Sequence, residues 1–272
     1  MNSMNLIKSA SAIIPFTFLL GCSNPAKDVP AASVEKASDS ATNVAATPEP
    51  EGRYFVFGPT NSAIAFTGSK VTGSHNGGFR NFAGEFKVVN GGLAKTGNKV
   101  VIDLSSLFAD NPRLTSHLKT PDFFGVAQNP TATFVSTAIE EKATNWLVTG
   151  DLTLHGVTKS ISFPAKIQVI EDAVSVSGVF VINRLDFDIK YPGMAGDLIR
   201  KEVVLRLNVK ATPGRADFNA LEQSAKLAAA AVQSMPAPGG GGQRPGPGGP
   251  RPGGPRPGGQ RPGPGPTGGG TQ

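Results

Sequence analysis

The stretch of sequence that decides the fold is residues 146–169, which read WLVTGDLTLHGVTKSISFPAKIQV. Apolar side chains alternate with polar ones on both sides of His155-Gly156, and a period of two residues is typical of half-buried strands. His155-Gly156 itself has the composition of a turn. The stretch therefore predicts two consecutive β-strands, each with one apolar and one polar face.

The same alternation recurs through residues 54–210 and predicts about eight or nine strands. Closing such a sheet into a barrel removes its exposed edges, so we expect an all-β fold, an antiparallel barrel of about eight strands. Residues 111–119 break the pattern and predict a short helical insertion that ends before Pro121. Residues 217–233 place apolar side chains at spacings of three and four and predict an amphipathic helix. That helix could pack on the barrel, pair with a second copy or lie on a membrane.

Composition divides the 272 residues into consecutive parts. Residues 1–21 have the composition of a signal peptide, and residues 22–52 that of a flexible linker. Residues 53–212 hold the barrel and residues 213–235 the helix. Residues 236–272 consist largely of Gly, Pro and Arg and contain no Val, Ile, Leu or Phe, which predicts a disordered tail.

The formal net charge of +6 does not indicate binding to nucleic acid. Basic and acidic residues are interleaved in the barrel domain, without the run of one sign that a nucleic-acid surface needs. The tail repeats Arg-Pro-Gly and contains no acidic residue. It could contact an anionic component of the cell envelope or simply be solvated.

The sequence contains no pattern that indicates catalysis or metal binding. His75, His117 and His155 lie far apart in the chain, without a second histidine at ligand spacing, and Gly-Xaa-Ser-Xaa-Gly is absent. We therefore predict no catalytic residue, no metal ligand and no cofactor.

Cys22, the single cysteine, follows Leu19-Leu20-Gly21 at the end of an apolar stretch. This arrangement resembles the signal peptide and lipobox of bacterial lipoproteins, in which the cysteine is acylated and becomes the first residue of the mature protein. Acyl chains of this kind hold a domain stably on a membrane. The resemblance implies lipidation at Cys22 and a place in the cell envelope, on the periplasmic or surface face of the outer membrane. The alternative is an ordinary cleavable signal with an incidental cysteine.

Three further strings are similar to one known family: TPDFFGVAQNPTATF at residues 120–134, GDLTLHGVTK at 150–159 and INRLDF at 182–187. In order and spacing they resemble the YceI-like family of bacterial periplasmic proteins, over residues 53–212. The resemblance implies a lipocalin-like barrel whose apolar cavity holds one isoprenoid or similar amphiphilic lipid, such as a polyprenyl quinone, and it implies no established enzymatic activity. Asp188 stands where many members have glycine, so the resemblance does not identify the ligand.

The phenylalanines supply most candidate binding residues, because the chain has 16 Phe but only two Tyr and one Trp. The candidates for the cavity wall lie in alternating strands: Phe66, Phe82, Phe86, Phe134, Trp146, Phe163 and Phe180. The candidates for the mouth lie near turns: Phe79, Phe123, Phe124, Phe187, His75 and Arg184, the last two as partners of a polar headgroup, for which Arg80 and Asn183 are also available. Alternatively, the rings fill the core, and the protein recruits a protein partner through its surface.

Overall fold

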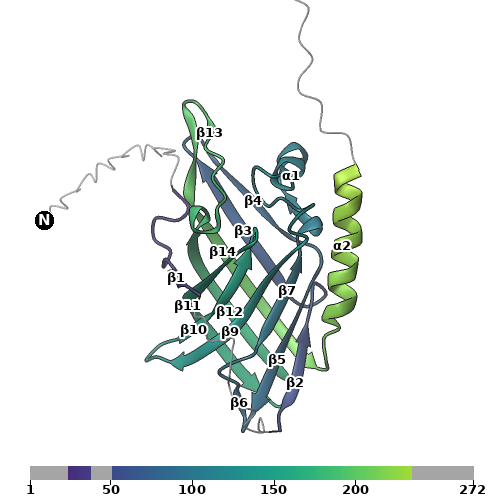
Figure 1. The fold of residues 1–272 in the computed structure, drawn as a ribbon. Helices are drawn as coiled ribbons and strands as arrows, with labels where there is room; N and C mark the ends of the chain where they lie inside the picture. The colour runs from purple at the N-terminus through teal and green to yellow at the C-terminus, as the bar shows by residue number, and fades with distance from the viewer. Residues whose placement is uncertain (1–23, 38–50, 235–272) are drawn as a thin grey trace, which may run out of the picture. The chain divides into compact units, whose positions relative to one another are not determined.

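The computed structural model describes residues 24–37 and 51–234, whose fold is shown in Figure 1. The predicted signal peptide, Cys22, residues 38–50 of the predicted linker and the predicted tail lie outside these residues. No helix within the described part of the chain is long and apolar enough to cross a membrane.

The described residues form a closed antiparallel barrel of eight strands, which confirms the predicted fold class. Three of these strands are interrupted: β2 (Arg53–Phe57) continues as β3 (Ala63–Lys70), β4 (Ser74–Phe79) as β5 (Phe82–Val89), and β7 (Lys99–Asp103) as β8 (Leu107–Ala109). The others are β9 (Thr131–Glu141), β10 (Trp146–Leu154), β11 (Val157–Ile170), β12 (Ala173–Asn183) and β14 (Asp197–Pro213). The long strand β14 closes the ring, because one edge pairs with β12 and the other with β3 and β2.

Residues 146–169 form the hairpin of β10 and β11 that their alternation predicts. Trp146 lies opposite Ala165, and Leu154 lies opposite Val157. His155 and Gly156 have φ angles of 51° and 75°, and positive φ at both positions is what a two-residue turn between twisted strands requires.

Glycines on the inner wall allow phenylalanine rings to lie flat against it. A Cβ atom added at Gly84 would lie 1.9 Å from Cζ of Phe57, which is on the neighbouring strand. A Cβ atom added at Gly77 would lie 2.3 Å from Cζ of Phe66, and one added at Gly150 would lie 2.4 Å from Cζ of Phe134. Because each ring occupies the space of the missing side chain, it does not project across the barrel.

Residues 24–37, which form part of the predicted flexible linker of residues 22–52, are held against the barrel. Strand β1 (Ser33–Lys36) pairs with β11, and the backbone N–H of Ala32 donates to the Val181 carbonyl of β12 at 2.8 Å. The ladder between β11 and β12 extends only from Lys166 to Ile170, just beyond Pro164, which has no N–H to donate. The segment therefore lies in the wall where β11 and β12 separate.

The turns between β3 and β4 and between β10 and β11 lie at the same end of the barrel, which we call the mouth end. Helix α1 (Pro112–Leu118) lies here, with Asn111 as its N-cap. So does the hairpin of β13 (Gly193–Met194) with the first residues of β14. The opposite end, which we call the far end, carries the short strand β6 (Gly92–Leu93).

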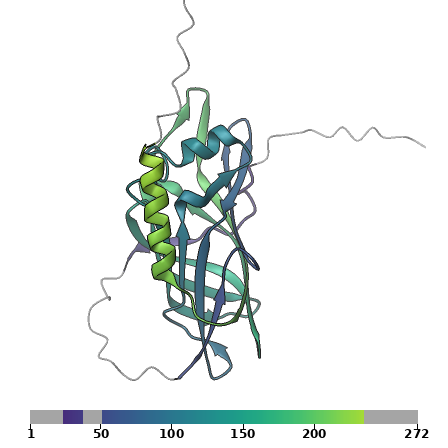
Figure 2. The same cartoon turned by 90° about the vertical axis from the view of Figure 1, so that its right-hand side faces the viewer.

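Helix α2 (Phe218–Ser234) packs on the outside of the barrel, as Figure 2 shows. It contacts β7 and β5, and its buried residues Leu221, Ala225 and Ala229 face the wall. Nζ of Lys99 on β7 lies 4.6 Å from the centre of the Phe218 ring. Of the three roles considered for this helix, packing on the barrel is the one observed.

Candidate functional site: an apolar cavity within the barrel

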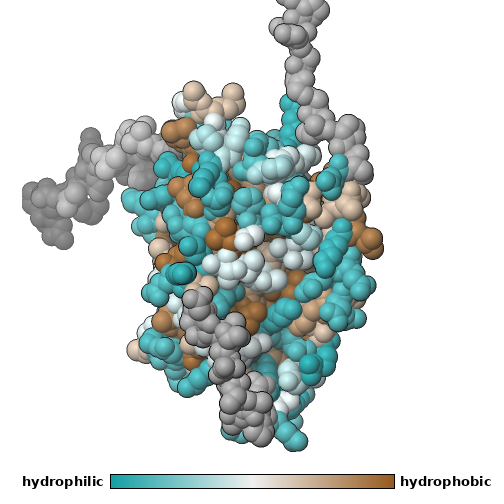
Figure 3. All heavy atoms as spheres, in the orientation of Figure 1, coloured by the Kyte–Doolittle hydropathy of each residue, from teal (hydrophilic) through white to brown (hydrophobic). Residues whose placement is uncertain are grey.

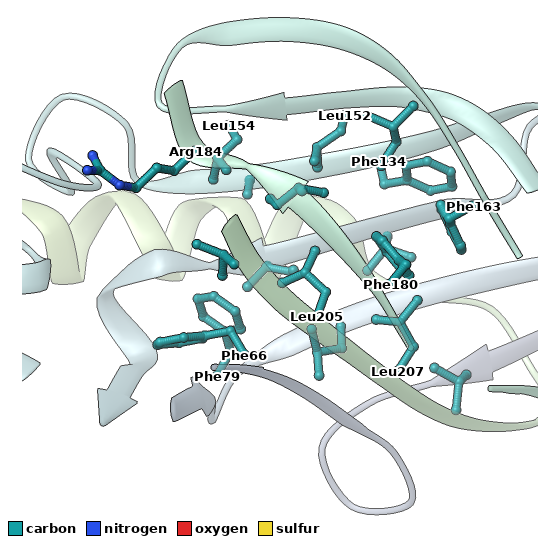
Figure 4. A pocket seen from close by; sticks show the side chains of 18 of the residues that line it. Phe66, Phe79, Phe134, Leu152, Leu154, Phe163, Phe180, Arg184, Leu205 and Leu207 are labelled. Atoms are coloured by element: carbon teal, nitrogen blue, oxygen red, sulfur yellow. The ribbon is translucent and has the colours of Figure 1, made fainter. Parts of the chain in front are cut away.

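The barrel encloses a cavity of about 410 Å³, a size within the range of small-molecule sites. Every strand of the ring contributes to its lining, and most lining side chains are aliphatic or aromatic. Figure 4 shows Arg184 at one end of the cavity and Phe134, Phe163 and Phe180 towards the other. The inner face of the sheet therefore surrounds a space suited to a hydrocarbon chain.

Most of the predicted wall residues lie in this lining. Phe66, Phe86, Phe134, Phe163 and Phe180 line the cavity. The rings of Phe163 and Phe180 stack with their centres 4.1 Å apart, and Phe134 lies 5.8 Å from Phe163.

Two predicted wall residues do not line the cavity. Phe82 is buried opposite Ile102, and Trp146 begins β10 at the far end, where it packs against the core. Alternation identifies the inward face of a strand but not the part of that face that borders the cavity.

At the mouth end, five of the six predicted residues line the cavity, namely Phe79, Phe123, Phe124, His75 and Arg184. Phe187 does not: it is fully buried in the short 3-10 helix Arg184–Phe187, and its carbonyl lies 3.2 Å from Nδ1 of His155. The further candidates point elsewhere, because Arg80 stacks on Phe108 at 4.3 Å and Asn183 caps the 3-10 helix.

The aliphatic part of the lining was missed as a binding surface, although its alternation was recognised. Every strand of the ring except β4–β5 contributes aliphatic side chains to it, and so does helix α1. Those of β14, β12, β11 and α1 are, in that order, Val203, Leu205, Leu207, Val209, Val176, Ile182, Ile161, Ile167, Leu114 and Leu118. The period-two signal in β14 could have identified its four residues. The two leucines of α1 carry no such signal, because a helix does not alternate with a period of two residues.

Two pairs of polar side chains lie at the mouth. Lys70 pairs with Asp197, whose other carboxylate oxygen accepts a hydrogen bond from the Thr72 hydroxyl at 2.9 Å. The Lys70 ammonium holds the pKa of Asp197 below its ordinary value. Nδ1 of His75 lies 2.7 Å from Oδ1 of Asp110. The mouth thus combines an apolar opening with polar groups at its edge, which suits an amphiphile.

Arg184 is a buried cation in this predominantly apolar lining. Its guanidinium donates to the backbone carbonyls of Arg200 at 3.0 Å, Ile199 at 3.2 Å and Ile189. Burial lowers the pKa of the group, and among the described residues no carboxylate pairs with it. Arg184 therefore fastens both sides of the β13 hairpin to the barrel, and its alkyl chain lines the cavity.

A buried amide and hydroxyl lie at the far end of the lining. The Asn98 side chain donates to Oγ of Ser136 at 2.9 Å and to the Ala94 carbonyl at 2.6 Å, and accepts from the Lys87 N–H. The hydrogen-bonding capacity of these groups is used within the protein, where they link β5, β7 and β9, so they are not free to bind a ligand. Among residues 24–37 and 51–234, no three His, Cys, Asp or Glu side chains gather in a way that could hold a metal ion.

An antiparallel eight-stranded barrel around one apolar cavity is the architecture of lipocalin-like ligand-binding proteins. The model of the YceI-like domain matches residues 55–211, and the chain belongs to this family.

Relatives and solved structures agree with this placement. A UPF0312 protein of Vibrio parahaemolyticus is 38% identical over 91 residues, which make up 33% of this chain and 48% of that protein. A UPF0312 protein of Pseudomonas aeruginosa is 36% identical over 91 residues, or 34% and 48% of the two chains. The chain thus spans about half the length of these curated relatives. The crystal structure of Burkholderia cenocepacia BcnA has a TM-score of 0.50 and 23% identity, covers 56% of this chain and 96% of that one, and shows similarity of fold.

Proposed function

We propose that this protein binds a long-chain isoprenoid, or a similar amphiphilic lipid, inside its barrel, and sequesters or carries it. The observation that carries the proposal is the predominantly apolar lining of the barrel cavity in a YceI-like domain. Removing apolar surface from water contributes roughly 25 cal/mol per Å², so binding needs no reacting side chain. The same cavity weighs against the alternative of a filled barrel.

The polarity of the lining supports one orientation of the lipid. The hydrocarbon chain would extend towards Phe163 and Phe180, and the headgroup would lie at the mouth near Lys70 and His75. A quinone carbonyl or a phosphate could accept a hydrogen bond from either residue. A headgroup placed at the far end would instead meet groups that are already paired with one another.

We further propose that Cys22 is acylated and anchors the protein in the cell envelope, at the outer membrane. The lipobox-like sequence around Cys22 supports this proposal. Metabolic labelling with a radioactive fatty acid tests it: label is expected in the wild-type chain and not in Cys22→Ser. Equal labelling of both would contradict the proposal.

Native mass spectrometry of the purified full chain, followed by organic extraction and lipid identification, tests the binding function. A stoichiometric adduct of isoprenoid mass is expected. Leu207→Trp places an indole in the cavity and should abolish the adduct, whereas Asn208→Trp adds the same group to the exposed face of the same strand and should not. An apo mass that stays unchanged after incubation with polyprenyl lipids would contradict the proposal and support a partner-recruiting barrel.

A further inference from the structure

We infer that the mouth end docks directly on a lipid bilayer through an exposed apolar patch formed by Val71, Met194 and Leu198, called here the mouth patch. Lipid would then pass between the membrane and the cavity without crossing water. This inference rests on the proposed lipid-binding function and adds the surface that exchanges the lipid.

The mouth patch is conspicuously exposed for apolar side chains. Met194, Leu198 and Val71 are 75%, 54% and 51% exposed, and the Val71 N–H donates to the Leu198 carbonyl at 3.2 Å. The tip of the β13 hairpin therefore adjoins the β3–β4 turn, and the three side chains belong to one surface. In Figure 3 the hairpin tip at the top is coloured as hydrophobic, above mainly hydrophilic neighbours. Exposed apolar groups gathered in this way are typical of protein or membrane contacts.

The patch continues into the cavity through the hairpin that carries it. Ile189 and Ile199 flank the hairpin and line the cavity, while Met194 and Leu198 face solvent. Arg184 binds the carbonyls of both isoleucines and so holds the base of the hairpin on the barrel. An apolar path thus leads from the exposed tip of the hairpin to the cavity. A surface that only bound another protein would not need such a path to the interior.

The charges around the patch favour a hydrocarbon surface over an oppositely charged partner. Residues 193–196 read Gly-Met-Ala-Gly and carry no charge. At the base of the tip, Asp197 is neutralised by Lys70, and Lys190 pairs with Asp188. Docking should therefore depend on apolar insertion and respond weakly to salt and to the fraction of anionic lipid.

The N-terminal segment supports the same orientation. Pro30 and Ala32 form backbone hydrogen bonds with Val181, which precedes the lining residue Ile182. Only seven residues lie between Cys22 and Pro30, and the eight residue-to-residue steps span at most roughly 29 Å when fully extended. An acyl anchor at Cys22 would accordingly hold the mouth end, rather than a distant part of the barrel, close to the membrane.

A position-specific fluorescence experiment tests the inference in the full chain. In a Cys22→Ser background, a nitrobenzoxadiazole probe is attached to Met194→Cys or, as control, to Leu227→Cys on α2, which is also 75% exposed. On addition of phosphatidylethanolamine–phosphatidylglycerol vesicles, the probe at position 194 should shift to the blue and be quenched by doxyl-labelled acyl chains. The probe at position 227 should remain in water.

A transfer assay connects docking to function. In the same background, M194D/L198D should slow the uptake of a fluorescent polyprenyl lipid from vesicles by at least roughly tenfold, since a charge at each position opposes insertion. The matched control L227D/I170D changes side chains of 75% and 57% exposure and should leave uptake unchanged. Loading of the same lipid from detergent micelles should be equal in all variants.

Several outcomes would overturn the inference. One is an equal response of the probes at positions 194 and 227, and another is vesicle uptake unaffected by M194D/L198D. A blue shift at 194 that depends on protein concentration and needs no vesicles would assign the patch to a second copy of the chain. If the wild-type chain fails to load even from micelles, the proposed lipid-binding function fails, while the probe at 194 still reports separately on docking.

Discussion

Gly84→Ala is expected to destabilise the barrel, because the added methyl group would collide with a ring that lines the cavity. The new Cβ would lie 1.9, 2.3 and 2.5 Å from Cζ, Cε1 and Cε2 of Phe57. The ring cannot remain against the wall and must turn towards the cavity. Overpacking of this kind costs about 1–3 kcal/mol, which lowers the melting temperature of a domain of this size by roughly 2–12 °C.

The matched control is Gly68→Ala. Gly68 lines the cavity and, like Gly84, lies in a strand, but a Cβ added at Gly68 would meet nothing within 4 Å. Because glycine within a strand is unfavourable by roughly 0.5–1 kcal/mol relative to alanine, G68A should be neutral or stabilising. Urea unfolding of the wild-type chain and both variants measures the difference.

A double-mutant cycle with Phe57→Leu identifies the cause of the loss. If the ring of Phe57 is the obstacle, Gly84→Ala should cost at least about 1 kcal/mol less in the F57L background than in the wild type. Additive free energies, or a cost of G84A within about 0.5 kcal/mol of zero, would refute the reasoning that a ring fills the place of each missing side chain.

Three further predictions concern the mouth and the outer wall. Arg184→Met removes the donor of three backbone carbonyls and should cost roughly 3 kcal/mol in urea unfolding, at about 1 kcal/mol for each orphaned carbonyl; an unchanged midpoint would contradict this. Hydrogen bonds from the Asn76 N–H and from His75 hold the pKa of Asp110 below its ordinary value. The ionised carboxylate should therefore add to the free energy of unfolding above the unfolded-state pKa of about 4. This contribution should disappear as pH falls through the lower pKa of the folded state. The difference between wild type and D110N should accordingly shrink as pH falls below about 4. A difference that grew over this range would show the opposite sign of coupling. On α2, buried Ala225→Leu should cost about 1–3 kcal/mol and reduce amide protection of the helix, whereas exposed Ala230→Leu should change stability by less than about 0.5 kcal/mol.

The fold could be predicted from the sequence because its signal is local. A strand with one buried face must alternate, and β5 shows this in strict form, with every second residue buried. The order of the strands and the docking of β1 could not be predicted in this way. The composition of residues 22–52 is that of a linker. Ser33–Lys36 pair with β11 where β11 and β12 have separated, more than a hundred residues away in the chain.

The candidate site could be predicted only in part, because lining a cavity depends on depth as well as on facing inward. Phe134 and Trp146 both lie on the apolar faces of their strands, yet only Phe134 borders the cavity, since Trp146 begins its strand at the far end. Likewise Phe123 and Phe187 both lie near turns, and the local fold alone decides which of them faces the mouth.

The hollow interior follows from how side-chain volume is distributed around the ring. A barrel of eight strands is just wide enough for its own side chains to fill it, so an open cavity needs positions that contribute less volume than usual. Gly77, Gly84 and Gly150 are such positions, and each is covered by a ring lying along the wall. The large apolar side chains thus form a continuous surface without meeting across the axis. The barrel keeps the burial that stabilises it and leaves a space whose walls gain contacts only when a hydrocarbon enters.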